Sequence, residues 1–123
     1  MKRYVRETQS DFVLRAMASD LAWAACAVAA VEAHLTLCAR FGEPLAREAA
    51  RRNLEVDWAR FAVVPLQEVV LVRAIEIGCQ TRIRTLDALH LAAAERLSSG
   101  VTLLTFDERQ AAAARELGFT VAP

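Results

Sequence analysis

The stretch VTLLTFDERQ, residues 101–110, indicates the fold class of this 123-residue chain. Its first six residues are all apolar or β-branched, which is the pattern of a buried strand. Asp107 follows at once and Gln110 lies three residues later, which predicts a capping box for a helix that continues to Leu117. A buried strand that runs directly into a helix is typical of α/β proteins.

The rest of the chain repeats this alternation of short apolar runs and segments with helical periodicity. Glycines mark the ends of several segments, and Gly78 is expected to end one helix as a left-handed cap. Because parallel neighbouring strands need helical crossovers, the pattern predicts a three-layer α/β fold with a parallel sheet. The expected helices are 7–18, 28–41, 45–53, 68–77, 85–97 and 108–117, and the expected strands are 21–26, 61–66, 101–106 and 119–121.

Length and composition indicate one domain, residues 1–123, with a substantial core. Apolar residues make up 55% of the chain, which excludes disorder as the main state. Fifteen basic residues balance fifteen acidic ones, so nucleic acid could bind only at a local patch. The longest uncharged stretch, 21–31, is far shorter than the roughly 20 residues of a membrane span, which predicts no membrane association. Three unpaired cysteines among apolar residues predict buried thiols and a cytoplasmic location: Cys26, Cys38 and Cys79.

One acidic residue lies beside an apolar stripe. Glu32 falls about 60° from the centre of the stripe on the helix that begins near residue 28, so it should face the core side. A carboxylate there is costly unless it is paired or binds a cation, and an ion pair with a nearby arginine is the structural alternative. The stripe consists of Val28, Val31, Leu35 and Ala39.

Two further acids occupy helix starts. Asp87 lies in the first turn of the helix opened by Thr85, and Asp107 follows a strand, where α/β sheets bind ligands. Both positions also favour acids for stability alone, through the helix dipole and the N-cap. Together with Glu32, they could converge on a hard cation such as Mg²⁺, which can support displacement at phosphorus. Phosphodiester hydrolysis is therefore the reaction class that fits.

Other chemistries lack the residues they need. The sequence has no Gly-rich phosphate loop, no late lysine of a phospho-receiver domain, and no serine on a strand-to-helix elbow. His34 and Cys38 lie four residues apart and could begin a zinc site, but no second pair follows. His90, one turn after Asp87, is typical of a packed helix residue.

Two motifs in order resemble a known family. RTLDALHLA at 84–92, followed by LTFDER at 104–109 and LGFTV at 117–121, resembles the carboxyl-terminal half of PIN-domain ribonucleases of the VapC type, toxins of type II toxin–antitoxin systems. Val31-Glu32-Ala33 resembles the second acidic position of that family, and the likeness runs over nearly the whole chain.

The resemblance implies a PIN-like fold and an Mg²⁺- or Mn²⁺-dependent endoribonuclease that cleaves RNA. It implies metal-binding carboxylates at Glu32, Asp87 and Asp107, with Thr105 as a hydrogen-bonding support for Asp107. It also implies an antitoxin partner and a homodimer. Contacts to RNA phosphates would come from an arginine cluster, for which a solvated surface is the alternative: Arg82, Arg84 and Arg109.

The family opens with a strand that ends in Asp-x-Ser/Thr and is central in its strand order 3-2-1-4-5. This sequence starts just beyond that strand, so the first catalytic Asp is expected to be missing and activity to be impaired. One hypothesis is that Met1 is a mis-set start of a longer, active protein. The other is a catalytically inactive remnant that acts as an antitoxin-binding or dimerisation module.

Overall fold

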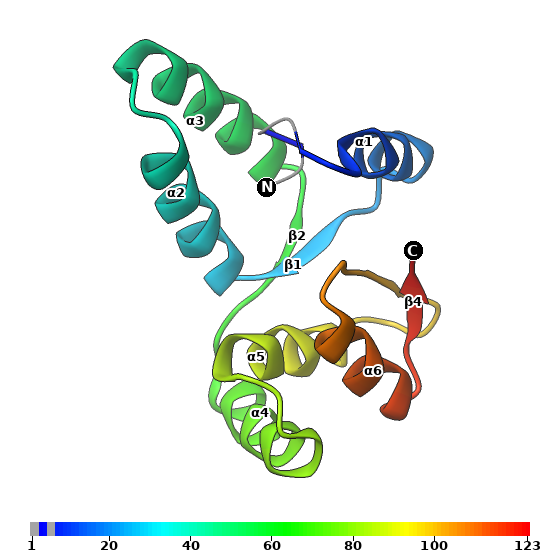
Figure 1. Ribbon diagram of the computed structural model, residues 1–123. Helices are drawn as coiled ribbons and strands as arrows, with labels where there is room; N and C mark the ends of the chain where they lie inside the picture. Colours follow the sequence, from blue (N-terminus) through cyan, green and yellow to red (C-terminus); the bar gives the residue numbers. More distant parts are fainter. Residues whose placement is uncertain (1–2, 5–6) are drawn as a thin grey trace. The chain divides into compact units, whose positions relative to one another are not determined.

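The computed structural model describes residues 3–4 and 7–123, which form helices and short strands (Figure 1). The predicted α/β class is confirmed, and β3 and β4 are parallel. No helix among these residues is long and apolar enough to cross a membrane. The helices are α1 Ser10–Ser19, α2 Val28–Arg40, α3 Pro44–Trp58, α4 Glu68–Thr81, α5 Thr85–Ala94 and α6 Glu108–Glu116, and the strands are β1 Ala24–Cys26, β2 Ala62–Val64, β3 Thr102–Leu104 and β4 Thr120–Ala122.

The chain divides into two compact units, Met1–Val63 and Val64–Pro123. The described strands form two pairs: β1 with β2, and β3 with β4. Thr102 of β3 lies opposite Thr120 of β4. The single domain over 1–123 stays a prediction.

The core of the N-terminal unit lies between α2 and α3. Leu37, Ala50 and Leu54 are buried together, and Ala33 and Phe41 pack against them. The prediction that the stripe with Val31 and Leu35 faces the core was therefore wrong, since both residues are exposed. Because α2 is rich in alanine, apolar residues occur on several of its sides, and packing against α3 selects the side that carries Leu37. The prediction of buried thiols was wrong for Cys38 on α2 and Cys79 on α4, which are exposed. Cys26 is buried as predicted.

An acidic cap extends α3 beyond the expected range of 45–53. The Glu43 carboxylate accepts hydrogen bonds from the backbone N–H groups of Leu45 (2.9 Å) and Ala46 (2.7 Å), and Pro44 begins the helix. These backbone hydrogen bonds hold the pKa of Glu43 below its ordinary value. At the other end the helix continues to Trp58, because Leu54 and Asp57 lie in its buried face.

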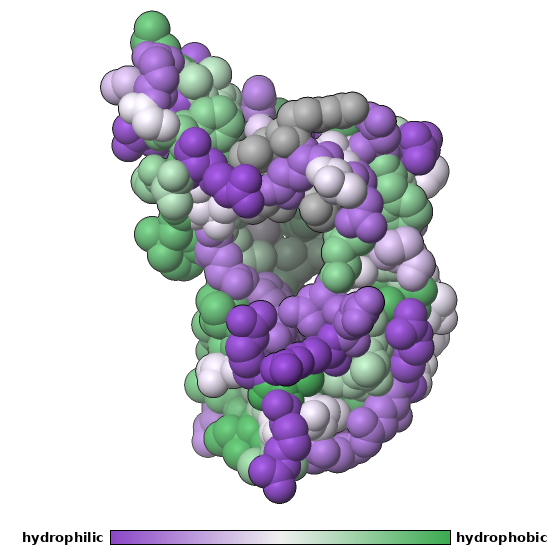
Figure 2. Space-filling model, in the orientation of Figure 1, coloured by the Kyte–Doolittle hydropathy of each residue, from purple (hydrophilic) through white to green (hydrophobic). Residues whose placement is uncertain are grey.

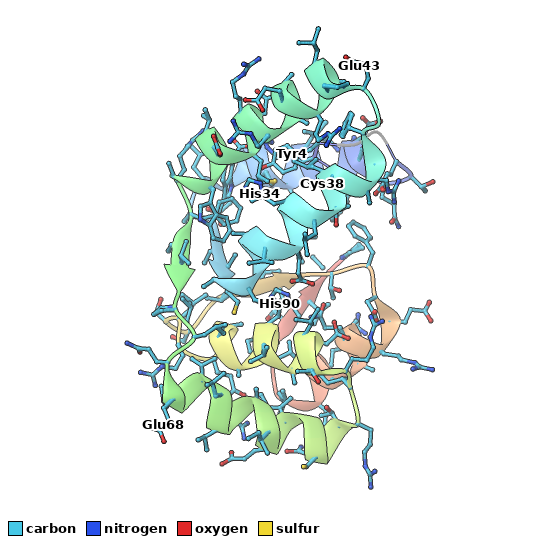
Figure 3. The ribbon with its side chains drawn as sticks, turned by 90° about the vertical axis from the view of Figure 1, so that its left-hand side faces the viewer. Tyr4, His34, Cys38, Glu43, Glu68 and His90 are labelled. Atoms are coloured by element: carbon cyan, nitrogen blue, oxygen red, sulfur yellow. The ribbon has the colours of Figure 1, made fainter. Side chains whose placement is uncertain are left out.

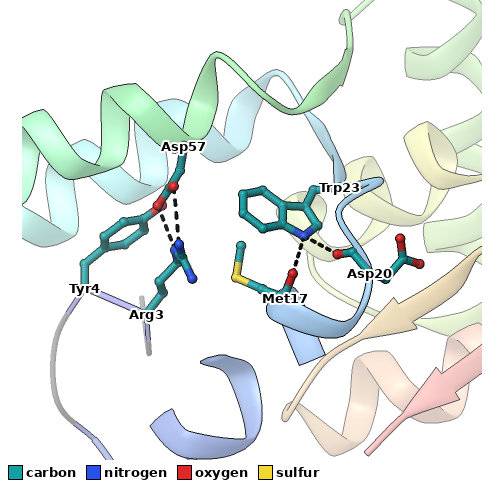
Figure 4. Close-up of polar contacts among 6 residues, drawn as sticks. All are labelled: Arg3, Tyr4, Met17, Asp20, Trp23 and Asp57. Carbon is teal, nitrogen blue, oxygen red and sulfur yellow. Dashed lines mark hydrogen bonds and ion pairs between the residues drawn. The ribbon is translucent and has the colours of Figure 1, made fainter. Parts of the chain in front are cut away.

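Asp57 is a buried acid with two long-range partners (Figure 4). Arg3 Nε donates to Asp57 Oδ2 at 2.7 Å, and the Tyr4 hydroxyl donates to the same oxygen at 2.8 Å. Burial alone would raise the pKa of Asp57, but the hydrogen bonds from Arg3 and Tyr4 outweigh it, so the pKa lies below its ordinary value. Burial, followed by the bond to Asp57, raises the pKa of Tyr4. The group joins the start of the chain to the end of α3.

The core of the C-terminal unit combines buried alanines of α4, α5 and α6 with the larger side chains of Val70, Ile77 and Leu91. The helix α4 does not end at Gly78 as predicted but continues to Thr81, and the left-handed cap is Arg82 (φ 64°). Gly78 faces α5, where an added Cβ would lie 3.9 Å from Ala88 Cβ. Gly78 is a residue of the helix interior without a positive φ, and its small size lets α4 pack close to α5. Gly118, by contrast, has φ 92° and follows α6 as expected.

Candidate functional site

Asp107 lies at the carboxyl end of β3 and caps α6. Its Oδ1 atom accepts hydrogen bonds from the backbone N–H groups of Arg109 (2.8 Å) and Gln110 (3.0 Å). The bond from Gln110, with a smaller contribution from Arg109, holds the pKa of Asp107 below its ordinary value. The Asp107 carboxylate is therefore held in place by the helix through Oδ1, and its Oδ2 atom takes no part in the cap.

Thr105 supports Asp107 from the end of the strand. Its hydroxyl oxygen accepts a hydrogen bond from the Asp107 backbone N–H at 3.1 Å. The Thr105 N–H donates to Ala122 O at 3.0 Å, which ties this turn to β4. The predicted capping box is thus only half formed, because the Asp107 N–H bonds to Thr105 and not to the Gln110 side chain.

Asp87 and Asp107 share one cationic partner, Arg84. Arg84 Nε lies 3.3 Å from Asp87 Oδ2, and Arg84 Nη2 lies 3.5 Å from Asp107 Oδ2. Asp87 is in the first turn of α5, and Arg84 is the residue that precedes this helix. Two of the three predicted metal ligands, separated by 20 positions in the sequence, are therefore directed at the same guanidinium group.

A shallow pocket of about 320 Å³ adjoins this pair, lined by Arg84, Asp107, Glu108 and Arg109. The other arginine of the predicted cluster, Arg82, is the exposed residue that ends α4, and its N–H donates to Gly78 O at 2.9 Å. Arg84 and Arg109 therefore share a pocket with two acidic residues, a mixed lining that suits a phosphate only beside a cation.

Glu32, the third predicted ligand, lies on α2 in the N-terminal unit and is partly exposed. Its backbone carbonyl accepts a hydrogen bond from the Thr36 hydroxyl at 2.8 Å. Within residues 3–4 and 7–123, no group of three or more His, Cys, Asp or Glu side chains is close enough to hold a metal ion. The three-carboxylate site stays a prediction, of which the C-terminal unit contains two members.

The histidines do not assemble a second centre. His34 and Cys38 lie one turn apart on α2 (Figure 3), and the residues described add no further ligand to them. His90 lies on α5 and is partly buried. The zinc alternative therefore gains no support.

The comparison with protein families resolves the class. The PIN domain family matches residues 4–116, which is most of the chain. The chain belongs to the PIN domain family. This PIN domain is also 38% identical over 89 residues to the protein named Ribonuclease VapC47 of Mycobacterium tuberculosis (strain CDC 1551 / Oshkosh), a match that covers 72% of this chain and 62% of that relative. No solved structure matches it.

The sequence missed one feature of the site. In the structure of this PIN domain, Arg84 pairs with both acids, which the sequence did not predict, and its contact to RNA stays a prediction. The spacing of Arg84 and Asp87, three residues apart at a helix start, could have predicted one of these pairs. The pair with Asp107 depends on how β3 and α5 pack, which no local pattern encodes.

Proposed function

We propose that this PIN domain is a metal-dependent endoribonuclease, the toxin of a toxin–antitoxin pair, with RNA as its substrate. The observation that carries the proposal is that the carboxylates of Asp87 and Asp107 converge on one group, the guanidinium of Arg84. The name of the similar Mycobacterium tuberculosis protein, a ribonuclease, supports the same activity. Because that match spans 62% of the relative, activity, substrate and partners are all proposed for this chain.

The donor set fits a hard divalent cation. Asp87 and Asp107 offer carboxylate oxygens, the ligands that Mg²⁺ and Mn²⁺ prefer, and both are paired with the single positive charge of Arg84. In the C-terminal unit, Asp87 and Asp107 would hold the ion, and Glu32 on α2 is proposed as a further ligand from the family resemblance alone. When bound, Mg²⁺ or Mn²⁺ supplies an activated water and stabilises charge on the phosphate oxygens. Thr105 holds Asp107 in position, and Arg82 and Arg109 are proposed to bind RNA phosphates.

Removing divalent cations tests this proposal. Incubation of the purified chain with a generic RNA and Mn²⁺ should give cleavage that a chelator abolishes and added Mn²⁺ or Mg²⁺ restores. Cleavage that persists in excess chelator would contradict the metal-dependent mechanism. If the chain does not cut RNA yet binds an antitoxin, it is a non-catalytic antitoxin-binding module, and the nuclease proposal fails.

We further propose that α4 pairs with α4 of a second copy to form a homodimer. On the side of α4 opposite its buried residues, Val72, Ile75 and Cys79 are exposed at spacings of three and four, the pattern of a helix–helix seam. Figure 2 shows hydrophobic surface where α4 lies, at the lower left. Antiparallel pairing would bring Glu68 at one end near Arg82 at the other, whereas parallel pairing would oppose equal charges.

Ile75→Asp is expected to weaken this dimer at least about tenfold, because it buries two unpaired carboxylates in the seam. Ile75 is 67% exposed, so the substitution leaves the core intact. Sedimentation equilibrium measures the effect. The matched control is Leu45→Asp, at a residue on α3 that is 78% exposed, which should leave the association unchanged. Equal association of wild type and Ile75→Asp would contradict the interface.

The free cysteines fit a reducing compartment, so the cytoplasm is the proposed location.

A further inference from the structure

Two arginines of the C-terminal unit, Arg73 and Arg84, both form ion pairs but differ in how firmly the guanidinium is held. Arg73 donates from Nε to Glu95 Oε2 at 2.7 Å, from Nη2 to Glu95 Oε1 at 3.0 Å, and from Nη1 to Glu76 Oε2 at 3.0 Å. This bidentate geometry clamps α4 to the end of α5, and the Arg73 side chain is 35% exposed. Its contacts have the lengths of strong charge-assisted bonds.

Arg84 is held by longer contacts. Its two ion pairs are 3.3 and 3.5 Å long, and neither carboxylate is held in a bidentate way. The side chain is 77% exposed, and such exposed pairs contribute about 0–1 kcal/mol. Arg84 precedes α5 without a side-chain capping bond, so its guanidinium has no role in starting the helix. Arg84 shares one positive charge between two acids, without a bidentate contact like that of Arg73 on Glu95.

We propose that Arg84 is an internal counter-ion of Asp87 and Asp107 that competes with the divalent cation for the two carboxylates. The inference rests on the nuclease function proposed above. Without the cation, the guanidinium offsets the repulsion between the two acids, both of which pair with it. A dication held by Asp87 and Asp107 would meet the guanidinium as a like charge, so its binding would displace Arg84 from at least one of the two acids. Arg84 thereby sets the cation concentration at which the site fills.

The chain offers a matched control for this competition. Arg109 lines the same pocket and carries the same charge, but only its backbone N–H contacts Asp107. Arg84→Gln and Arg109→Gln therefore remove one positive charge each from the same neighbourhood. Only the first removes a group that is bonded to the carboxylate oxygens. Arg84→Lys keeps the charge but loses the fork that reaches both acids at once.

The test is a calorimetric titration of Mn²⁺ into the full chain without RNA, at low and at high salt. Arg84→Gln should tighten Mn²⁺ binding about three- to tenfold at low salt, Arg109→Gln less than twofold, and Arg84→Lys by an intermediate factor. The gain of Arg84→Gln should shrink at high salt, because an exposed charge is screened. Binding by Arg84→Gln where the wild type shows none would support the proposal most directly.

Unchanged or weaker Mn²⁺ binding by Arg84→Gln would overturn the counter-ion role, as would an equal gain in Arg109→Gln. The absence of binding in every variant would overturn it too. Because the titration contains no RNA, a failure here is distinct from a failure of the nuclease proposal, which the cleavage assay with chelator decides.

Discussion

Asp107→Asn is expected to lower RNA cleavage at least about 100-fold while leaving the fold intact. The carboxylate supplies a negative oxygen, Oδ2, that the amide cannot replace as a cation ligand. The N-cap role survives, because asparagine accepts the bonds from Arg109 and Gln110 as well as aspartate does. The measurement is the initial rate of RNA cleavage in Mn²⁺, with helix content recorded by circular dichroism.

Glu108→Gln is the matched control for this variant. Glu108 follows Asp107, is exposed, lines the same pocket and loses the same charge, yet it is not a predicted ligand. Its cleavage rate should stay within about twofold of the wild type. Asp87→Asn should behave like Asp107→Asn, because Asp87 is the other carboxylate on Arg84. Wild-type cleavage by Asp107→Asn, or an equal loss in Glu108→Gln, would refute the assignment of Asp107.

Asp57→Ala is expected to lower the free energy of unfolding by about 2–3 kcal/mol, the largest stability effect we predict. The substitution leaves the Tyr4 hydroxyl and the Arg3 guanidinium without the acceptor that joins them to α3. Urea unfolding followed by the fluorescence of Trp23 and Trp58, in the same unit, measures it. Tyr4→Phe, which removes a single hydroxyl, should cost about 1 kcal/mol.

The loss at Asp57 should depend on pH in a defined direction. The pKa of Asp57 is lowered in the folded protein, so its contribution is present above the unfolded value of about 3.9 and disappears as pH falls through the folded pKa. The stability gap between wild type and Asp57→Ala should therefore close in acid. Asp20→Asn, at an exposed acid whose Oδ1 accepts from the Ala22 N–H, should change stability by less than about 0.5 kcal/mol. A gap that stays constant in acid would contradict the ionic origin.

Local sequence determined which segments became helices and strands. Gly118, with φ 92°, ended α6, and Asp107 capped its start, as each residue's own backbone chemistry requires. The motifs around Asp87 and Asp107 likewise identified the PIN family, because the spacing of residues on one helix or turn depends on neighbours a few positions away.

Tertiary packing decided the rest. The buried side of α2 could not be read from an alanine-rich helix whose apolar residues point several ways, and contact with α3 selected Leu37 over Val31 and Leu35. Asp57 pairs with Arg3, which lies 54 positions away in the sequence. Arg84 reached Asp107 only because α5 and β3 fold into one unit. Ion pairs between distant residues depend on where the elements pack, and sequence periodicity carries no information about that placement.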